Sequence, residues 1–379
     1  MSRSKSEIGD QFQDCNTCGL CFQSCEAYKD QDPRHIKEAL KALLEDDISV
    51  DDALTAYRCT LCGYCKTECP FSLNLADLFR AIRITYCESG RGPLAHHTPL
   101  LTNKRINFFS LYDKSALKKP RYPEQADRIF YPGCAMSAYR PDLISKISNY
   151  LEGALVMRHE CCGKPLKDIG AEDEYEDHNA SMLGLLEGLN PSQIITACPN
   201  CYKIFKPRIK FAEVLFAEEA ILKRVGDAGL KEPGDLGTIA IHDPCPFRER
   251  PELFEIAREF VDSLYPGKRT ELVHSREKQQ CCGAGGGVNF AHEELAKRIA
   301  HFRLKDAKSV GADTVVTFCV SCAVQFGSVA RETGVRILHA LDLLEPCTIP
   351  DYESIYTKSR RLFKGHRAFI NLLRLSLQV

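Results

Sequence analysis

The sequence predicts an α+β protein in which an N-terminal α-helical unit precedes two pseudo-symmetric α/β domains with mainly parallel sheets. The first reason is an internal repeat: residues 128–134 (RIFYPGC) match residues 238–245 (TIAIHDPC), and residues 193–198 (QIITAC) match residues 314–319 (TVVTFC). The second is that these short β-branched and aromatic runs alternate with helical segments, which is typical of α/β units. The third is that all but two of the 20 cysteines fall into four regularly spaced blocks.

The expected helices are placed by apolar periodicity and by proline. Apolar residues recur at helical spacing over residues 36–44, and a second helix is expected over residues 75–88, ended by two glycines. Pro141 and Pro251 suit the first position of a helix in each repeat. The stretch after residue 90 is rich in Pro, Lys and Arg and lacks a sustained period, which indicates a connector. The predicted units are the helical unit 1–90, the connector 91–126, the first α/β domain 127–236, the second 237–349 and a tail 350–379.

The composition is that of an ordinary globular protein. Of the 379 residues, 44% are hydrophobic, and 50 basic residues nearly balance 51 acidic ones, so no overall charge favours nucleic acid as a partner. Residues 1–14 are polar and lack a signal-peptide core, and no run of about 18 apolar residues occurs. We therefore predict a cytoplasmic chain without a membrane span, with association to a membrane through a partner subunit as an open alternative. A reducing compartment disfavours disulfides, which leaves metal binding for the cysteines.

Two runs near the N-terminus have the spacing C-x2-C-x2-C-x3-C, which is highly specific for iron–sulfur clusters. The first three sulfurs of such a run hold one cluster, and the fourth reaches the neighbouring cluster. Zinc is the alternative, but zinc sites are usually assembled from two separated pairs. Glu26 follows the first run in place of proline, which removes no ligand. We predict two cubane [4Fe-4S] clusters, one held by Cys15, Cys18, Cys21 and Cys69 and the other by Cys59, Cys62, Cys65 and Cys25.

Each α/β repeat carries five cysteines in the order C…CCG…CxxC. Five thiolates exceed the four that a tetrahedral zinc or one ordinary cubane requires, and adjacent cysteines can hold two metals of one larger cluster. Zinc remains an alternative here. Gly163 and Gly283, which follow the paired cysteines, allow a tight turn, and backbone N–H groups freed by glycines can donate to cluster sulfur. The two sets are Cys134, Cys161, Cys162, Cys198 and Cys201, and Cys245, Cys281, Cys282, Cys319 and Cys322.

The whole layout resembles the heterodisulfide reductase catalytic family in its fused D-subunit form, in which a dicluster ferredoxin unit precedes two CCG domains. The resemblance covers residues 14–345 and is carried by YPGC at residues 131–134, HDPC at residues 242–245 and CCGAGGG at residues 281–287. It implies a non-cubane [4Fe-4S] cluster in each complete five-cysteine set, the two facing each other across a cleft where a disulfide is split in one-electron steps. Relatives that serve as electron-transfer subunits of glycerol-3-phosphate or glycolate dehydrogenases share the layout and can lack some of these ligands.

The predicted function is that of an iron–sulfur oxidoreductase subunit. Electrons pass through the two cubane clusters to the two non-cubane clusters, which reduce a disulfide or oxidise thiols. The alternative is a non-catalytic electron-transfer subunit that links a flavoprotein dehydrogenase to a quinone or a membrane cytochrome. The sequence has no flavin or nicotinamide fingerprint, so both functions need a redox partner subunit, either a flavoprotein or a membrane cytochrome of the b type. The remaining partner is a small disulfide or thiol substrate.

Several residues beside the cysteine motifs are further candidates. His242 could deliver a proton to a product thiolate, although a hydrogen-bonded structural histidine is the simpler interpretation. Lys164 and Arg248 could supply positive charge to an anionic substrate or to a reduced cluster. The glycine run 283–287 matches no nucleotide-binding pattern, so we expect its backbone to crowd a cluster. The two cysteines outside the blocks, expected to be small buried hydrophobic residues, are Cys87 and Cys347.

The C-terminal tail is basic and amphipathic. From residue 354 on it has no acidic residue, and its apolar residues recur at helical spacing. Three interpretations remain open: packing on the protein itself, a partner surface, or a membrane surface. The basic residues are Lys358, Arg360, Arg361, Lys364, Arg367 and Arg374, and the apolar ones are Leu362, Phe369, Ile370, Leu373 and Leu377.

Overall fold

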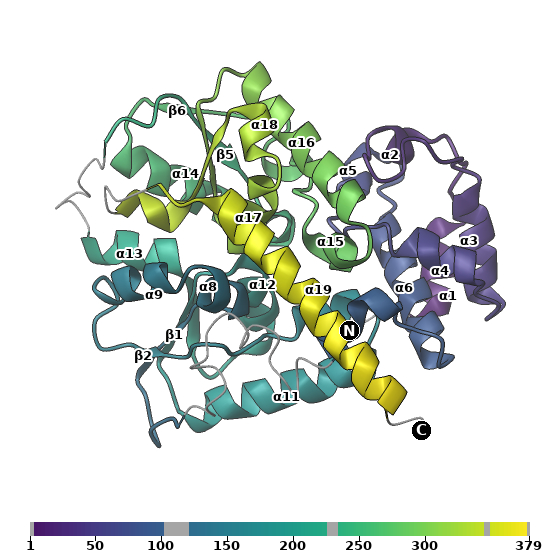
Figure 1. The fold of residues 1–379 in the computed structure, drawn as a ribbon, viewed down its shortest axis with the longest axis horizontal. Coiled ribbons are helices and arrows are strands. Elements are labelled where there is room, and N and C mark those ends of the chain that lie inside the picture. Colours follow the sequence, from purple (N-terminus) through teal and green to yellow (C-terminus); the bar gives the residue numbers. More distant parts are fainter. Residues whose placement is uncertain (1–3, 102–120, 226–233, 345–348, 377–379) are drawn as a thin grey trace.

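The computed structural model describes residues 4–101, 121–225, 234–344 and 349–376. Two α/β units (teal and green) lie next to each other, a helical unit (purple) lies beside them, and one long C-terminal helix (yellow) crosses the front of the molecule (Figure 1). None of the helices within these residues combines the length and the hydropathy that a membrane crossing requires. The predicted α+β architecture is therefore confirmed.

The N-terminal unit is a series of short helices around a shared apolar core. Two of them begin at serine caps, because Ser4 and Ser49 each form a capping box with the acidic residue three positions on. Asn74 caps the longest helix by accepting a hydrogen bond from the N–H of Ala76 at 3.2 Å. Both predicted helices are present. The helices are α1 (Lys5–Phe12), α2 (Leu20–Gln23), α3 (His35–Leu44), α4 (Val50–Ala56), α5 (Cys65–Glu68) and α6 (Leu75–Glu88).

The described part of the connector is partly helical. Its turns η1 (Ala95–His97) and α7 (Thr98–Leu101) pack against the second α/β unit and the C-terminal helix. Residues 102–120 lie outside the described part of the chain.

The first α/β unit contains a four-stranded parallel sheet in the order β2-β1-β3-β4. The register pairs Tyr131 with Thr196 at the carboxyl ends of the two central strands. Pro141 is the first residue of its helix, as predicted. The strands are β1 (Arg128–Tyr131), β2 (Leu155–Val156), β3 (Gln193–Thr196) and β4 (Glu213–Phe216), and the helices are α8 (Cys134–Tyr139), α9 (Pro141–Ser148), α10 (Lys164–Asp168), α11 (Glu172–Gly188), α12 (Pro199–Arg208) and α13 (Ala217–Val225).

The second α/β unit repeats this topology as β6-β5-β7-β8, again with parallel pairs only, which confirms the predicted repeat. Pro251 is the N-cap residue directly before α14 (Glu252–Leu264), whereas the sequence predicted it at the first position inside the helix. The strands are β5 (Ile239–His242), β6 (Arg269–Thr270), β7 (Thr314–Thr317) and β8 (Arg336–His339). The helices are η6 (Cys245–Glu249), α14 (Glu252–Leu264), η7 (Arg276–Lys278), η8 (Gly285–Gly287), α15 (Val288–Ala291), α16 (Glu293–Ser309), α17 (Val320–Gly327), α18 (Ala330–Thr333) and η9 (Ala340–Leu344).

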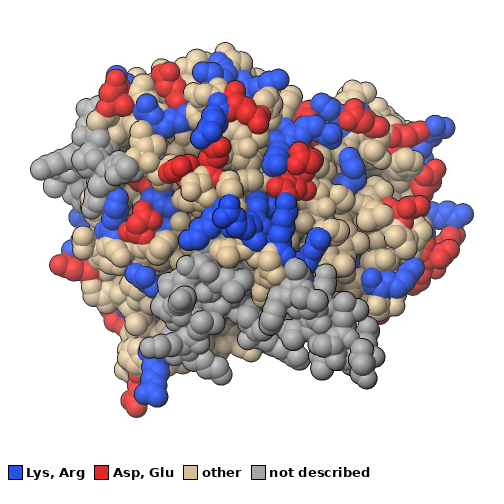
Figure 2. Space-filling model, in the orientation of Figure 1, with Lys and Arg blue, Asp and Glu red and all other residues tan. Residues whose placement is uncertain are grey.

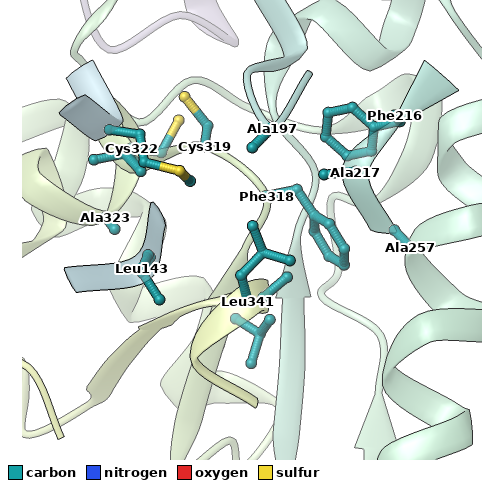
Figure 3. Packing of buried hydrophobic residues seen from close by; sticks show 14 of the residues in the cluster. Leu143, Ala197, Phe216, Ala217, Ala257, Phe318, Cys319, Cys322, Ala323 and Leu341 are labelled. Atoms are coloured by element: carbon teal, nitrogen blue, oxygen red, sulfur yellow. The ribbon is translucent and has the colours of Figure 1, made fainter. Parts of the chain in front are cut away.

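The two α/β units share one hydrophobic core. Phe216 at the end of β4 meets Phe247 of the second unit edge-on, with ring centroids 5.9 Å apart, and Phe247 lies 6.0 Å from Phe318. Figure 3 shows Phe318 beside Ala257 in this core, whereas the sulfur of the next residue, Cys319, points the other way. After β7, adjacent residues therefore point in different directions, with Phe318 toward the interior of the core and Cys319 at its edge.

Arg83 on α6 joins the helical unit to both α/β units. Its side chain is fully buried. The guanidinium donates to Ala56 O at 2.7 Å and Cys59 O at 2.5 Å within its own unit. It also donates to Asp168 O of the first α/β unit at 2.7 Å and to Gly286 O of the second at 2.9 Å. One side chain thus links three units, and its five N–H donors suit such a junction.

The glycine run after the second CC pair forms part of the same junction. A Cβ on Gly285 would lie 2.6 Å from Thr60 O, and one on Gly286 would lie 2.3 Å from Cys59 O. Gly286 also has a φ of +64°, which side chains disfavour. The backbone of this run thus approaches the backbone of the helical unit at Cys59 and Thr60; because Cys59 is a predicted cluster ligand, the expected crowding of a cluster stays a prediction.

The predicted tail is helix α19 (Tyr352–Ser376), which packs along α17 and α7 (Figure 1). Its inner face is anchored by Tyr352, whose hydroxyl lies 2.6 Å from Nη1 of Arg140, and by Phe363, whose ring centroid lies 4.5 Å from that of Phe290. Lys358 is exposed on its outer face. Figure 2 shows basic side chains across the centre of this view, where Figure 1 places α19. The tail therefore packs on the protein itself, while the side chains of its predicted apolar stripe beyond residue 367 lie outside the described part.

Candidate metal centres

Four cysteines of the helical unit lie around one small cavity. Cys15, Cys18, Cys21 and Cys69 line it together with apolar residues of α1 and α3. The pKa of Cys21 is raised to about 12, mainly by burial and in addition by the neighbouring Cys69, Cys15 and Cys18. Cys69 comes from the second run, so these thiols belong to the exchanged set that the spacing predicts. Cys18 is exposed, which puts this group at the surface.

The remaining four cysteines of the helical unit lie together in its interior. Burial raises the pKa of Cys25, and Cys62 and Cys59 add to the effect. Burial also raises the pKa of Cys65, with contributions from Cys59, Cys62 and Cys25. The last cysteine of the first run therefore lies among the first three of the second.

The cysteines of the first α/β unit follow the carboxyl ends of its strands. Cys134 begins α8 after β1, and Cys198 caps α12 after β3. A hydrogen bond from the thiol of Cys201 lowers the pKa of Cys198, although burial opposes this effect. The N–H of Gly163 donates to Sγ of Cys161 at 3.4 Å, and Gly163 has a φ of +80°. The turn thus directs a backbone donor to sulfur, as the sequence predicts.

The second unit repeats this arrangement. The sulfurs of Cys282 and Cys322 lie 3.0 Å apart, and hydrogen bonds from neighbouring thiols lower the pKa of Cys282. The N–H of Gly283 donates to Sγ of Cys281 at 3.2 Å. A Cβ on Gly283 would lie 2.4 Å from Ala296 O, so only glycine fits this turn.

One cleft lies between the two α/β units, with a volume of about 190 Å³. Its walls carry thiols from both units, and Cys62 of the helical unit lines it as well. Figure 3 shows Cys319 and Cys322 together at one edge of the core. The cysteines that line the cleft are Cys62, Cys134, Cys162, Cys198, Cys201, Cys245, Cys282, Cys319 and Cys322.

The helical unit contacts the second α/β unit through sulfur. The thiols of Cys62 and Cys281 are hydrogen-bonded, and this bond, together with burial, raises the pKa of Cys62. Arg248 holds the same junction: it donates to Cys62 O, to Glu277 O at 3.0 Å and to Gln279 O at 2.6 Å. The guanidinium of Arg248 thus connects loops through their carbonyl groups. Arg248 is not among the residues that line the cleft.

These groups fit iron–sulfur clusters. Burial raises the pKa of most of the clustered thiols, which means that the surroundings alone favour neutral sulfur. A bound cation reverses that preference, because coordinated thiols lose their protons. Four or five soft sulfur donors that converge in a buried place are the donor set of an iron–sulfur cluster.

Two domain families match the chain. The 4Fe-4S dicluster domain matches residues 11–73, and the Cysteine-rich domain (CCG) matches residues 129–206 and 239–327. These matches coincide with the helical unit and the two α/β units.

Curated relatives are similar to this chain over most of its length. The D subunit of dihydromethanophenazine:CoB–CoM heterodisulfide reductase from Methanosarcina acetivorans is 26% identical over 368 residues, which cover 82% of this chain and 87% of the relative. The chain carries a 4Fe-4S dicluster domain and two CCG regions and is similar to heterodisulfide reductase D subunits. The B subunit of fumarate reductase (CoM/CoB) from Methanothermobacter marburgensis is 26% identical over 88% of this chain and 72% of its own length. EtfAB:quinone oxidoreductase of Syntrophomonas wolfei is 25% identical over 71% of this chain and 42% of its own length.

In this heterodisulfide reductase-like chain, the cationic side chains of the cleft are neutralised. Lys164 lines the cleft as predicted, but it pairs with Asp168 one helical turn away. Lys203 pairs with Glu249 across the two CCG halves, which we define as the units built on β1–β4 and on β5–β8. Arg360 binds Glu293 at 2.9 Å. In the described part of the cleft, each Lys or Arg therefore has a carboxylate partner.

His242 lies behind the cysteines and does not line the cleft. Its ring is fully buried, and burial lowers the pKa of the imidazole. One of its ring nitrogens and the sulfurs of Cys282 and Cys322 lie within 4.8 Å of one another. The imidazole thus lies beside cysteine sulfur, and its role as a proton donor stays a prediction.

The sequence did not reveal the contribution of α19 to the cleft. Tyr356, Ser359, Arg360 and Phe363 of this helix line it. The basic, amphipathic pattern predicted a helix with a buried face, but it carried no signal for the surface that this face would meet. Of the two cysteines outside the motifs, Cys87 is half-buried, and Cys347 lies outside the described residues.

Proposed function

We propose that this chain is the disulfide-reducing subunit of an iron–sulfur oxidoreductase. The observation that carries the proposal is the single cleft whose walls hold thiols from both five-cysteine sets. A disulfide bound there would have each sulfur next to a different set. Reduction would consume two electrons and two protons for each S–S bond and release two thiols, and the reverse reaction would oxidise two thiols.

The proposed ligands follow the grouping of the thiols. Each cubane would take one exchanged set, and each non-cubane cluster would take one full C…CCG…CxxC set. When bound, the clusters would supply single electrons. The chain would hold them, exclude water from them and direct the N–H groups of Gly163 and Gly283 to ligand sulfur.

The proposed electron path runs from the surface to the cleft. Exposed Cys18 marks the point where a redox partner subunit, either a flavoprotein or a membrane cytochrome of the b type, would deliver electrons. The interior set of the helical unit comes next, and the hydrogen bond between Cys62 and Cys281 connects it to the second CCG half. The first CCG half would therefore receive its electrons through the second.

The test is the metal content of anaerobically purified protein. We expect about 16 iron atoms per chain, in four clusters of four, and an EPR signal that changes when a thiol is added. Cys282→Ser should lose the iron of one cluster, whereas Cys87→Ser, which changes a half-buried cysteine outside the four sets, should retain it. About 8 iron atoms, with zinc in the CCG halves, would contradict the proposal.

The similarity to EtfAB:quinone oxidoreductase supports a second candidate, an electron relay that connects a flavoprotein to a quinone or membrane cytochrome. The two candidates differ in one assay. Fully loaded, chemically reduced protein should reduce at least one disulfide of a low-molecular-weight panel if it is a reductase. Reduction of none, combined with electron transfer from a flavoprotein to a quinone, would favour the relay.

A further inference from the structure

The two CCG halves place a polar side chain at the same position of the fold. Tyr131 ends β1 and His242 ends β5, and each stands three residues before the first cysteine of its set. The register pairs Tyr131 with Thr196 and His242 with Thr317, which confirms that the two positions are equivalent. Both side chains are fully buried.

The hydrogen bonds of His242 determine which ring nitrogen carries the proton. Nε of Arg303 lies 3.2 Å from Nδ1 of His242. Arginine can only donate, so Nδ1 accepts and the proton of the neutral ring is on Nε2. Nε2 has no hydrogen-bond partner in the described residues. One ring nitrogen of His242 and the sulfurs of Cys282 and Cys322 lie within 4.8 Å of one another, so these sulfurs are the candidate acceptors for its proton.

Arg303 is itself held in place, which keeps the imidazole oriented. It is fully buried, forms an ion pair with Asp306 and donates to His274 O at 2.5 Å. The ring of His242 also meets Phe326 edge-on, with centroids 4.8 Å apart. The donor at Nε2 is thus fixed by packing and by hydrogen bonding.

Tyr131 has the corresponding arrangement in the first half. Its buried hydroxyl has no hydrogen-bond partner in the described part of the chain. Tyr131 belongs to the same buried cluster as Cys162 and Cys201, and after burial the groups that raise its pKa are Cys201, Cys162, Cys161 and Cys134. The ring packs edge-on against Phe205, with centroids 5.0 Å apart.

We propose that Tyr131 and His242 are equivalent positioning residues that donate hydrogen bonds to the cysteine sulfurs of the two CCG centres and raise the reduction potentials of those centres. A hydrogen bond to a ligand sulfur favours the more negative, reduced state. The inference rests on the proposed binding of clusters, but it does not require that the substrate is a disulfide.

The two donors are not equal, which makes the two centres inequivalent. Behind His242 stands the guanidinium of Arg303, whereas Tyr131 is a neutral phenol with an aromatic neighbour. The positive charge strengthens the imidazole donor and favours electrons at the second centre. We therefore expect the second centre, which contacts Cys62, to have the higher potential.

The test compares Tyr131→Phe and His242→Phe in EPR-monitored redox titrations of the loaded chain. Each variant should shift the midpoint potential of one CCG signal to a more negative value, and His242→Gln, which retains an N–H donor, should recover part of the shift. His339→Phe is the matched control, because His339 ends β8 in the same sheet and is fully buried, with Asp342 and Arg140 rather than cysteines as its charged neighbours.

Electron–nuclear double resonance of the unmodified chain in D₂O tests the same contacts without a substitution. Both CCG signals should show an exchangeable deuteron, and Tyr131→Phe and His242→Phe should each remove one. Absence of such deuterons in the unmodified chain, or an equal shift in His339→Phe, would overturn the inference. Shifted potentials without reduction of any disulfide would overturn only the proposed reductase. CCG halves without iron would overturn both.

Discussion

The two CCG halves have the same strand order and the same cysteine spacing, yet they differ in their surroundings. The second half contacts the helical unit through the thiols of Cys62 and Cys281, and it carries a histidine backed by a cation at the end of β5. The first half contacts the helical unit through the ion pair of Arg80 with Glu172, shares the Arg83 junction with the second half, and carries a tyrosine at the end of β1. A duplicated ligand set can therefore form two inequivalent redox sites when each half has different neighbours.

The halves also differ at the end of the outer strand. Two residues after β4 the first half has Glu218, and the corresponding residue after β8 is Leu341. Both are buried, and neither carboxylate oxygen of Glu218 has a partner in the described residues. Burial raises the pKa of Glu218 to about 8. Four experiments test how the two halves differ and how they are joined.

The largest effect is expected from losing a ligand. Cys282→Ser and Cys162→Ser remove equivalent cysteines, so each should cost the iron of one cluster and at least about 100-fold in disulfide reduction. In rapid mixing with a reductant, Cys282→Ser should also slow the reduction of the cluster in the first CCG half. Cys162→Ser should leave the reduction rate of the cluster in the second CCG half unchanged. Equal rates for the two variants would contradict the order of electron transfer.

Arg83→Met should cost about 3–5 kcal/mol of unfolding free energy, because several buried carbonyls would lose their donor at once. Denaturant unfolding of the loaded chain measures it. Arg80→Met is the control: it breaks only the half-buried ion pair with Glu172 of the first half, which should cost less, about 1–2 kcal/mol. A similar loss in both variants would mean that Arg83 is not the main junction.

Glu218→Gln should stabilise the chain by about 2–3 kcal/mol at pH 7. The reason is that the glutamine amide, unlike the carboxyl of Glu218, does not have to take up a proton when the chain folds. The folded-state pKa of Glu218, about 8, exceeds the ordinary value of 4.5. Between pH 4.5 and pH 8 the folded chain therefore binds more protons than the unfolded chain does. Stability of the unsubstituted chain should therefore fall as pH rises through that window, and the variant should lose this dependence. Parallel stability–pH curves would argue against the buried, unpartnered carboxyl.

The smallest effect concerns the ion pair that spans the two halves. Lys203→Met should cost about 0.5 kcal/mol, because the Glu249 side chain is 63% exposed and water screens the pair. A double-mutant cycle with Glu249→Gln measures the coupling. A coupling energy above about 1.5 kcal/mol would mean that this contact sets the relative position of the halves.

Local patterns predicted much of the fold. The helix over residues 75–88 has the expected bounds, and four predicted strand runs are β1, β3, β5 and β7. Capping, apolar periodicity and turn residues act over a few residues, so the sequence carries them directly. The roles of Arg248 and of the glycine run were not predictable, because their partners lie in another unit.

Cysteine spacing alone predicts the ligand sets, because a separation of two or three residues constrains which sulfurs can meet. The sequence also predicts that the cysteines of the CCG halves follow strand ends. The contact of Cys62 with Cys281, the reach of Arg83 to Gly286 across 203 positions and the lining of the cleft by α19 are visible in the tertiary structure alone. Such contacts depend on how the units pack against one another. The local sequence pattern of one unit does not identify which residues of another unit it will contact.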